Sequence, residues 1–136
     1  MAKTSTTSIP QLLLPSEAEV KRAVCAWLTL NLYHWIRIQS GNLFLTYRNT
    51  KGHERGRAVQ CAQPGTADLL VILPPNGYAL WLEIKSRRKG SKQSPEQVEF
   101  AEKMARLGAG YRVVRHVDEL PTFMREELEN AKVRRA

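Results

Sequence analysis

The first strong periodicity in the chain follows residue 15. Apolar side chains recur every three or four positions: Val20, Ala23, Val24, Trp27 and Leu28. Ser16 precedes this run and Glu19 stands three residues after it, which is the capping-box spacing at a helix N-terminus. The pattern predicts an amphipathic helix over 17–30, with its apolar face toward a core.

Strand-like segments come next. Residues 34–39 and 43–48 are rich in β-branched and aromatic side chains, and the turn sequence Ser40-Gly41-Asn42 separates them. They are predicted to pair as a hairpin. Residues 49–65 are polar, basic and glycine-containing, so they are predicted to form a loop.

A second hairpin is predicted more strongly. Residues 68–73 are almost wholly apolar, residues 78–86 alternate, and Pro74-Pro75-Asn76-Gly77 between them is a turn sequence. In the second strand the apolar Leu80, Leu82 and Ile84 are expected to point into the core. Glu83 and Lys85 then share the opposite face, because successive side chains of a strand alternate.

The C-terminal part reads as helix, strand and helix. Ser94 is an N-cap with Pro95 at the first helical position, and 111–115 is a short strand before a last helix that opens at Asp118. The apolar face expected for the first of these helices is Val98, Ala101, Met104, Ala105 and Leu107. A helix between two strands favours a parallel crossover. We therefore expect an α/β fold with a central mixed β-sheet flanked by helices.

The length of 136 residues fits one compact domain. We expect a flexible, partly apolar N-terminal segment over 1–15, a single domain over 16–130 and a basic tail over 131–136. Hydrophobic residues make up 43% of the chain. They form no stretch long enough to span a membrane and no signal-peptide pattern. Cys25 and Cys61 have no metal-ligand spacing and are expected to be free thiols, so a cytoplasmic location in a bacterial or phage-infected cell is predicted.

The formal net charge is +8 and the sequence pI is about 9.9, which favours a polyanionic partner such as nucleic acid. Two basic clusters stand on either side of the second hairpin and are candidate DNA-binding residues: Arg48, Lys51, Arg55 and Arg57 before it, and Arg87, Arg88, Lys89 and Lys92 after it. Both clusters are expected to flank one cleft and to contact phosphates. The alternative is a solvated basic surface.

The candidate chemistry lies on the second hairpin. Asp68 opens its first strand, and the turn can return Glu83 to within reach of it. Two converging carboxylates favour a hard cation such as Mg²⁺ or Mn²⁺. Such an ion polarises a phosphodiester and lowers the pKa of a bound water. Lys85 would then orient the water or offset developing charge, whereas an isolated Glu-x-Lys pair would be an ordinary exposed ion pair.

These residues carry a family resemblance. The segment "PGTADLLVILPPNGYALWLEIKS", followed by "KQSPEQVEFAEKM", resembles the VRR-NUC branch of the PD-(D/E)XK nucleases, and the resemblance runs from Ser16 to about Asp118. Its elements are Glu17, Gly65, Asp68, Glu83, Lys85 and Gln97.

The resemblance implies a restriction-endonuclease-like core and a Mg²⁺- or Mn²⁺-dependent endonuclease with no organic cofactor. Asp68, Glu83 and the Ile84 backbone carbonyl would hold the metal, Glu17 would reach it through water, and Lys85 would assist the nucleophile. Stand-alone phage or bacterial members are similar to Holliday-junction resolvases and act as homodimers. Branched DNA is the implied substrate.

Three of these positions also have structural explanations. Glu17 is preferred over Glu19 for the helix role, because it shares a face with Val20 and Val24 whereas Glu19 is explained by the capping box. Gln97 is either an active-site residue or only the capping partner of Ser94. Gly65 is expected to permit a tight backbone entry to the Asp68 strand.

The sequence therefore predicts a metal-dependent endodeoxyribonuclease. Two alternatives stay open: a basic DNA-binding module without catalysis, and a restriction-type nuclease that reads base edges in a linear duplex.

Overall fold

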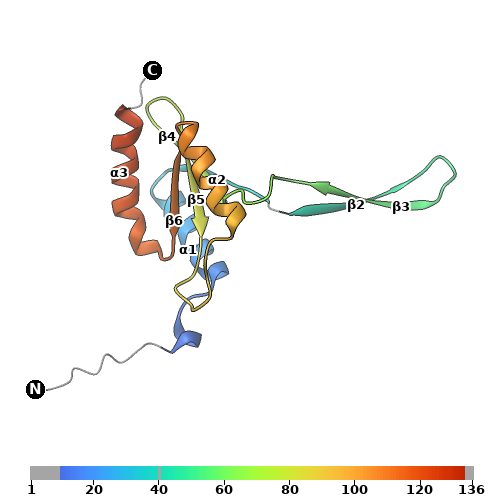
Figure 1. The fold of residues 1–136 in the computed structure, drawn as a ribbon, viewed down its shortest axis with the longest axis horizontal. Helices are drawn as coiled ribbons and strands as arrows, with labels where there is room; N and C mark the ends of the chain where they lie inside the picture. Colours follow the sequence, from blue (N-terminus) through green and yellow to red (C-terminus); the bar gives the residue numbers. More distant parts are fainter. Residues whose placement is uncertain (1–9, 40, 134–136) are drawn as a thin grey trace, which may run out of the picture.

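The computed structural model describes residues 10–39 and 41–133. The helical elements are the 3-10 helices η1 (Gln11–Leu13) and η2 (Val117–Glu119) and the α-helices α1 (Glu17–Leu30), α2 (Pro95–Arg106) and α3 (Leu120–Val133). The strands are β1 (His34–Arg37), β2 (Asn42–Arg48), β3 (Glu54–Gln60), β4 (Leu69–Leu73), β5 (Tyr78–Ile84) and β6 (Gly110–Val114). Figure 1 shows a compact body from which β2 and β3 project.

The body is built on a four-stranded sheet in the order β1-β4-β5-β6. β4 pairs antiparallel with β1 and β5, whereas β5 and β6 are parallel with α2 as the crossover. The predicted mixed sheet flanked by helices is thus confirmed at the level of class and sheet type. β5 and β6 can be parallel because α2 supplies the long connection that a parallel pair requires, as the sequence indicated.

One face of the sheet carries the hydrophobic core. Buried side chains from α1, β4, β5, β6 and the C-terminal helical segment form it: Val20, Val24, Leu28, Leu69, Val71, Leu73, Leu80, Leu82, Ile84, Val114, Leu120 and Met124. The alternation of β5 is as predicted, so Leu80, Leu82 and Ile84 face this core. Glu83 therefore points to the opposite face of the sheet, where α2 lies.

Helix α2 begins as predicted at Pro95, but its expected apolar face is only partly covered: Ala101 and Met104 are half-buried, whereas Val98, Ala105 and Leu107 are exposed. None of its residues is buried, and Val98 and Leu107 are 42% and 69% exposed. The ring of Phe100 instead packs edge-on against Trp81 at 5.2 Å between centroids and contacts Tyr111. The single ring of Phe100 thus contacts both β5 and β6, so the helix needs no continuous apolar stripe.

The first predicted hairpin is also wrong. β1 pairs with β4, and β2 pairs with β3 in a separate two-stranded sheet, so much of the loop expected at 49–65 is strand. β3 has the sequence ERGRAVQ and buries none of its residues. A strand without a core-facing side lacks the apolar alternation by which strands are found in a sequence.

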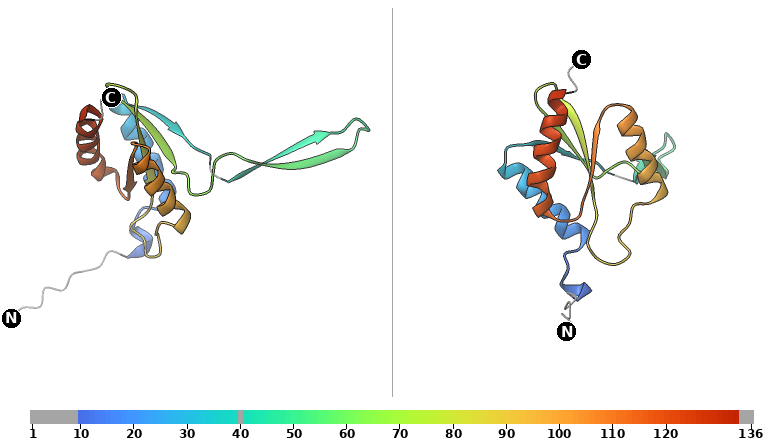
Figure 2. Two further views of the ribbon diagram at one scale, coloured as in Figure 1. Left: turned by 45° about the horizontal axis from the view of Figure 1, so that its top comes forward. Right: turned by 60° about the vertical axis from the view of Figure 1, so that its left-hand side comes forward.

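The paired residues 42–60 are called the arm below. Figures 1 and 2 show the arm as a twisted ribbon that extends well beyond the helices and the main sheet. At its base the Cys61 amide donates to the Gly41 carbonyl, 3.1 Å away. The arm therefore leaves the body as a closed hairpin.

The two ends of the body differ from expectation in detail. The described part of the N-terminal segment packs on the loop after β5, because the Arg88 guanidinium donates to the Leu14 carbonyl and the Lys89 amide donates to the Gln11 side chain. Residues 1–9 of that segment lie outside the described residues. Helix α3 continues to Val133, so the first half of the expected tail is helical, and 134–136 are not described. Among the described residues no helix is long and apolar enough to cross a membrane.

Candidate functional site

The hairpin register places the two central carboxylates side by side. Leu69 pairs with Leu82, so Asp68 and Glu83 are the next opposed positions, on the face that α2 covers. Asp68 Oδ2 accepts a hydrogen bond of 2.8 Å from the Ile84 amide. The N–H and C=O of a strand residue point toward the same neighbouring strand, so the Ile84 carbonyl also faces the Asp68 side.

Glu83 is an unusual carboxylate. It is 3% exposed, and only one of its oxygens is satisfied: Oε1 accepts from Gln97 Nε2 at 2.9 Å, whereas the buried Oε2 has no hydrogen-bond partner among the described residues. Burial raises the pKa of Glu83 to about 8, and the neighbouring charge of Asp68 and the hydrogen bond that the protonated carboxyl makes with Asp68 add to the rise. A buried carboxylate oxygen without a partner is a position for a cation or a proton.

Lys85 lies between two acidic groups. Its ammonium is 3.8 Å from Glu83 Oε1 and 3.8 Å from Glu17 Oε1, so the helix α1 and the strand β5 meet at this lysine. Glu19 instead forms the capping box with Ser16. The structure thus brings Glu17 to the carboxylate cluster and gives Glu19 the structural role predicted for it.

Gln97 combines the two roles that the sequence left as alternatives. Its side-chain oxygen accepts from the Ser94 amide at 2.8 Å and so completes the capping box of α2, while its Nε2 donates to Glu83. One amide can do both because its donor and its acceptor point in different directions. The hydrogen bond from the Ser94 amide therefore fixes the Gln97 side chain, which in turn donates to Glu83.

Gly65 has the predicted backbone role. Its φ is +82°, and a Cβ at this position would collide with the carbonyl group of Glu96 in the first turn of α2. Glycine is needed for both the left-handed conformation and the close approach. The segment before Asp68 is thereby pressed against the helix end that carries Gln97.

Lys21 is a residue of the site that the sequence analysis missed. Its ammonium lies 2.7 Å from Asp68 Oδ1, and both side chains are largely buried. The available signal was its position one helical turn after Glu17, which puts both residues on the same side of α1. Lys21, Arg37, Ile38, Gln39 and Asp68 line a hollow of about 440 Å³ beside the carboxylates.

The donor atoms fit a hard divalent cation. Within the described residues no three His, Cys, Asp or Glu side chains gather as a metal-binding group. The site offers the carboxylates of Asp68 and Glu83 and the Ile84 carbonyl, and Mg²⁺ commonly takes one or two protein carboxylates with water completing its shell. The observation that fits such an ion is the buried Glu83 Oε2, to which no group in the described part of the chain donates a hydrogen bond.

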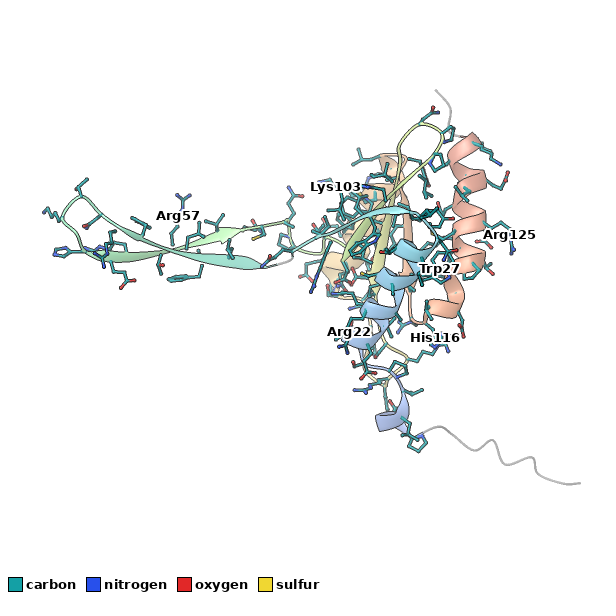
Figure 3. The ribbon with its side chains drawn as sticks, turned by 180° about the vertical axis from the view of Figure 1, so that it is seen from behind. Arg22, Trp27, Arg57, Lys103, His116 and Arg125 are labelled. Atoms are coloured by element: carbon teal, nitrogen blue, oxygen red, sulfur yellow. The ribbon has the colours of Figure 1, made fainter. Side chains whose placement is uncertain are left out.

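The basic clusters do not flank one cleft as expected. Arg48, Lys51, Arg55 and Arg57 lie on the projecting arm, because residues 54–60 of the predicted loop form β3 and pair with β2. Arg87, Lys89 and Lys92 are exposed in the loop after β5, but Arg88 is tied to the N-terminal segment. Figure 3 labels Arg57 midway along the arm, away from the body.

Comparisons with protein-family models, with curated proteins and with solved structures found no match for this chain.

Proposed function

We propose that this chain is a Mg²⁺- or Mn²⁺-dependent endodeoxyribonuclease with a restriction-endonuclease-like core of the PD-(D/E)XK type, as the motif resemblance implies. The observation that carries the proposal is the pair Asp68 and Glu83, opposed across one hairpin, with a lysine beside it and a buried carboxylate oxygen that has no hydrogen-bond partner within residues 10–39 and 41–133. A carboxylate pair with an adjacent ammonium suits hydrolysis of a phosphodiester bond.

In this proposal the chain supplies positioning and charge. A bound divalent cation would polarise the phosphodiester and lower the pKa of its water. Asp68, Glu83 and the Ile84 carbonyl would hold that ion, and Gln97 would keep Glu83 in place through its hydrogen bond. Lys85 would orient the attacking water and stabilise the negative charge that develops on the phosphate.

Glu17 and Lys21 extend the site toward solvent. Glu17 is half exposed and would reach the ion through water, while its contact with Lys85 keeps the ammonium at the reaction centre. Lys21 would exchange Asp68 for a substrate phosphate when the ion binds, because a second cation on the same carboxylate is unfavourable. The adjoining hollow also contains Arg37, so a phosphate there would meet two positive charges.

The substrate proposed is DNA, with preference for branched forms such as four-way junctions, and the active form proposed is a homodimer. Both come from the motif resemblance. Two copies related by a two-fold axis would set two sites against two opposed strands.

A binding module without catalysis is the second candidate. The observation that favours it is the ion pair between Lys21 and Asp68, in which an ammonium already occupies one of the carboxylates that a metal needs. Such a pair in a catalytic site has to open, whereas in a binding module it would be permanent.

Cleavage assays separate the two candidates. A labelled four-way junction, a linear duplex and a flap are incubated with Mg²⁺, Mn²⁺ or EDTA and wild type, Asp68→Asn or Glu83→Gln. Glu19→Gln is the matched control, because it removes a glutamate charge from α1 without touching the site. Metal-dependent cutting that is lost in the first two variants and kept in the third supports the nuclease. Folded wild type that binds every substrate and cuts none supports the binding module.

A further inference from the structure

The arm is the largest feature of the molecule that the proposed site does not use. β2 and β3 pair only with each other among the described strands, and both faces of the ribbon are exposed. An isolated two-stranded hairpin is at best marginally stable in water. Its exposed apolar side chains include Leu43, Phe44, Leu45 and Tyr47, with Phe44 67% exposed. Such a ribbon is expected to be covered by a partner when it functions.

The charge of the arm indicates the chemistry of that partner. Arg48, Lys51, Arg55 and Arg57 stand against the single acid Glu54, so residues 42–60 carry +3 of the chain's formal +8. The rest of the chain then carries +5. A second copy of this chain would therefore present like net charge to the arm, whereas a polyanion would be attracted to it.

The cross-strand register combines cationic and apolar groups on one face. Arg57 lies opposite Leu45, and Arg55 lies opposite Tyr47. Arginines can reach phosphates and base edges while the apolar groups contact sugars and thymine methyl groups. On the other face the Phe44 ring lies over Gly56, where a Cβ would collide with it. Gly56 therefore lets the Phe44 ring lie against the backbone of β3.

The arm also starts at the candidate active site. The amide of Ile38, just before the arm, donates to the main-chain carbonyl of Asp68 at 2.8 Å. Gln39 lines the same hollow as Lys21 and Asp68. Seven residues per strand, at about 3.4 Å each, give a reach of roughly 24 Å. That is more than half of the helical repeat of B-DNA, about 34 Å.

We propose that the arm enters the major groove of the DNA duplex next to the scissile phosphate, with Arg55 and Arg57 as its main contacts. The major groove of B-DNA admits a two-stranded β-ribbon. This inference rests on the proposed function, because it takes the substrate to be DNA held at Asp68 and Glu83. The arm then fixes the direction in which the duplex leaves the site.

Binding in EDTA tests the arm separately from cleavage. The affinity of the full chain for a 30-base-pair DNA duplex is measured at several salt concentrations. Arg55→Gln with Arg57→Gln should lower the affinity about tenfold and the salt slope by about 2. Arg106→Gln with Arg125→Gln, which makes the same change of charge on α2 and α3, is the control and should stay within about twofold. A second variant replaces residues 43–59 with Asn-Gly, a sequence that closes two-residue hairpins.

An RNA duplex of equal length distinguishes groove entry from general attraction. The major groove of A-form RNA is too narrow for a protein ribbon, so neither arm variant should change RNA affinity by more than about twofold. Equal losses on DNA and RNA, or unchanged DNA affinity, would overturn the proposal. So would a change in sedimentation from dimer to monomer in the arm variants, which would assign the ribbon to a second copy. Arm-dependent DNA binding by a wild type that never cuts would leave this inference standing and remove the nuclease.

Discussion

Replacement of Glu83 by glutamine should stabilise the metal-free protein, and the gain should depend on pH. The carboxyl is buried, and its pKa in the folded chain is raised from 4.5 to about 8. Below pH 4.5 the group is protonated in both the folded and the unfolded chain, so it carries no ionisation penalty. As the pH rises toward 8 the unfolded chain ionises first, and the folded state loses stability by linkage.

The size of this effect follows from the same values. Each unit of separation between the two pKa values corresponds to about 1.4 kcal/mol, so wild type should lose on the order of 3 kcal/mol between pH 4.5 and pH 7 relative to Glu83→Gln. Above pH 8 the difference should level off. Urea unfolding in EDTA at pH 4.5, 6, 7 and 9 measures it. Glu19→Gln reports the effect of removing a charge outside the site.

Two outcomes would show that Glu83 is not a desolvated, unpaired carboxylate. A difference between Glu83→Gln and wild type that is constant with pH would mean that Glu83 ionises normally and is not desolvated. A wild type that is more stable than the variant at pH 9 without metal would mean that Oε2 has a partner. Addition of Mn²⁺ should restore wild type but not the variant, because a cation compensates the buried charge.

Four further substitutions test neighbouring parts of the site. Gln97→Ala and Ser94→Ala should each lower the free energy of unfolding by about 1 kcal/mol in thermal unfolding, because each weakens the N-terminal cap of α2. Only Gln97→Ala should reduce cleavage strongly, because only Gln97 donates to Glu83. Equal losses of activity in the two variants would mean that Gln97 acts only as a helix cap. Gly65→Ala should lower the unfolding free energy by roughly 2 kcal/mol, from the left-handed backbone and the collision with α2, and unchanged stability in urea would contradict the close approach. Lys21→Met should tighten Mn²⁺ binding about fivefold in calorimetry, because the part-buried ion pair with Asp68 that the metal must replace is worth on the order of 1 kcal/mol. Weaker binding would show that Lys21 does not compete with the ion.

The body of the fold could be predicted because local signals and burial agree there. Ser16 and Ser94 both form the capping boxes that their spacing predicted, and the two helices begin where those caps place them. The alternation in β5 and the turn after β4 together fix the register of that hairpin. That register alone brings Asp68 opposite Glu83, so the centre of the site followed from the sequence.

The arm could not be predicted by the same means. Its strands bury nothing against the body, so the alternation that identifies a strand is absent from β3. Its pairing depends on contacts within the ribbon, such as the Phe44 ring over Gly56, which have no periodic signature. The turn at Ser40-Gly41-Asn42 therefore suggested a hairpin between the wrong pair of strands.

Lys21 was missed for a different reason. Its partner Asp68 is 47 positions away in the chain, and the contact requires α1 to pack on the hairpin at a definite angle. A sequence specifies which face of α1 is apolar, but it does not specify how far along β4 that face lies. Polar contacts between elements depend on this placement.

Direct measurement of Mn²⁺ binding tests the proposed nuclease site, because the proposed cleavage requires a cation at Asp68 and Glu83. Titration of the full chain with Mn²⁺ at pH 9, followed by the electron paramagnetic resonance signal of the free ion, should reveal binding in wild type and in Glu19→Gln. That binding should be lost in Asp68→Asn and in Glu83→Gln. Equal binding by all four proteins, or none by folded wild type, would show that Asp68 and Glu83 do not hold a cation.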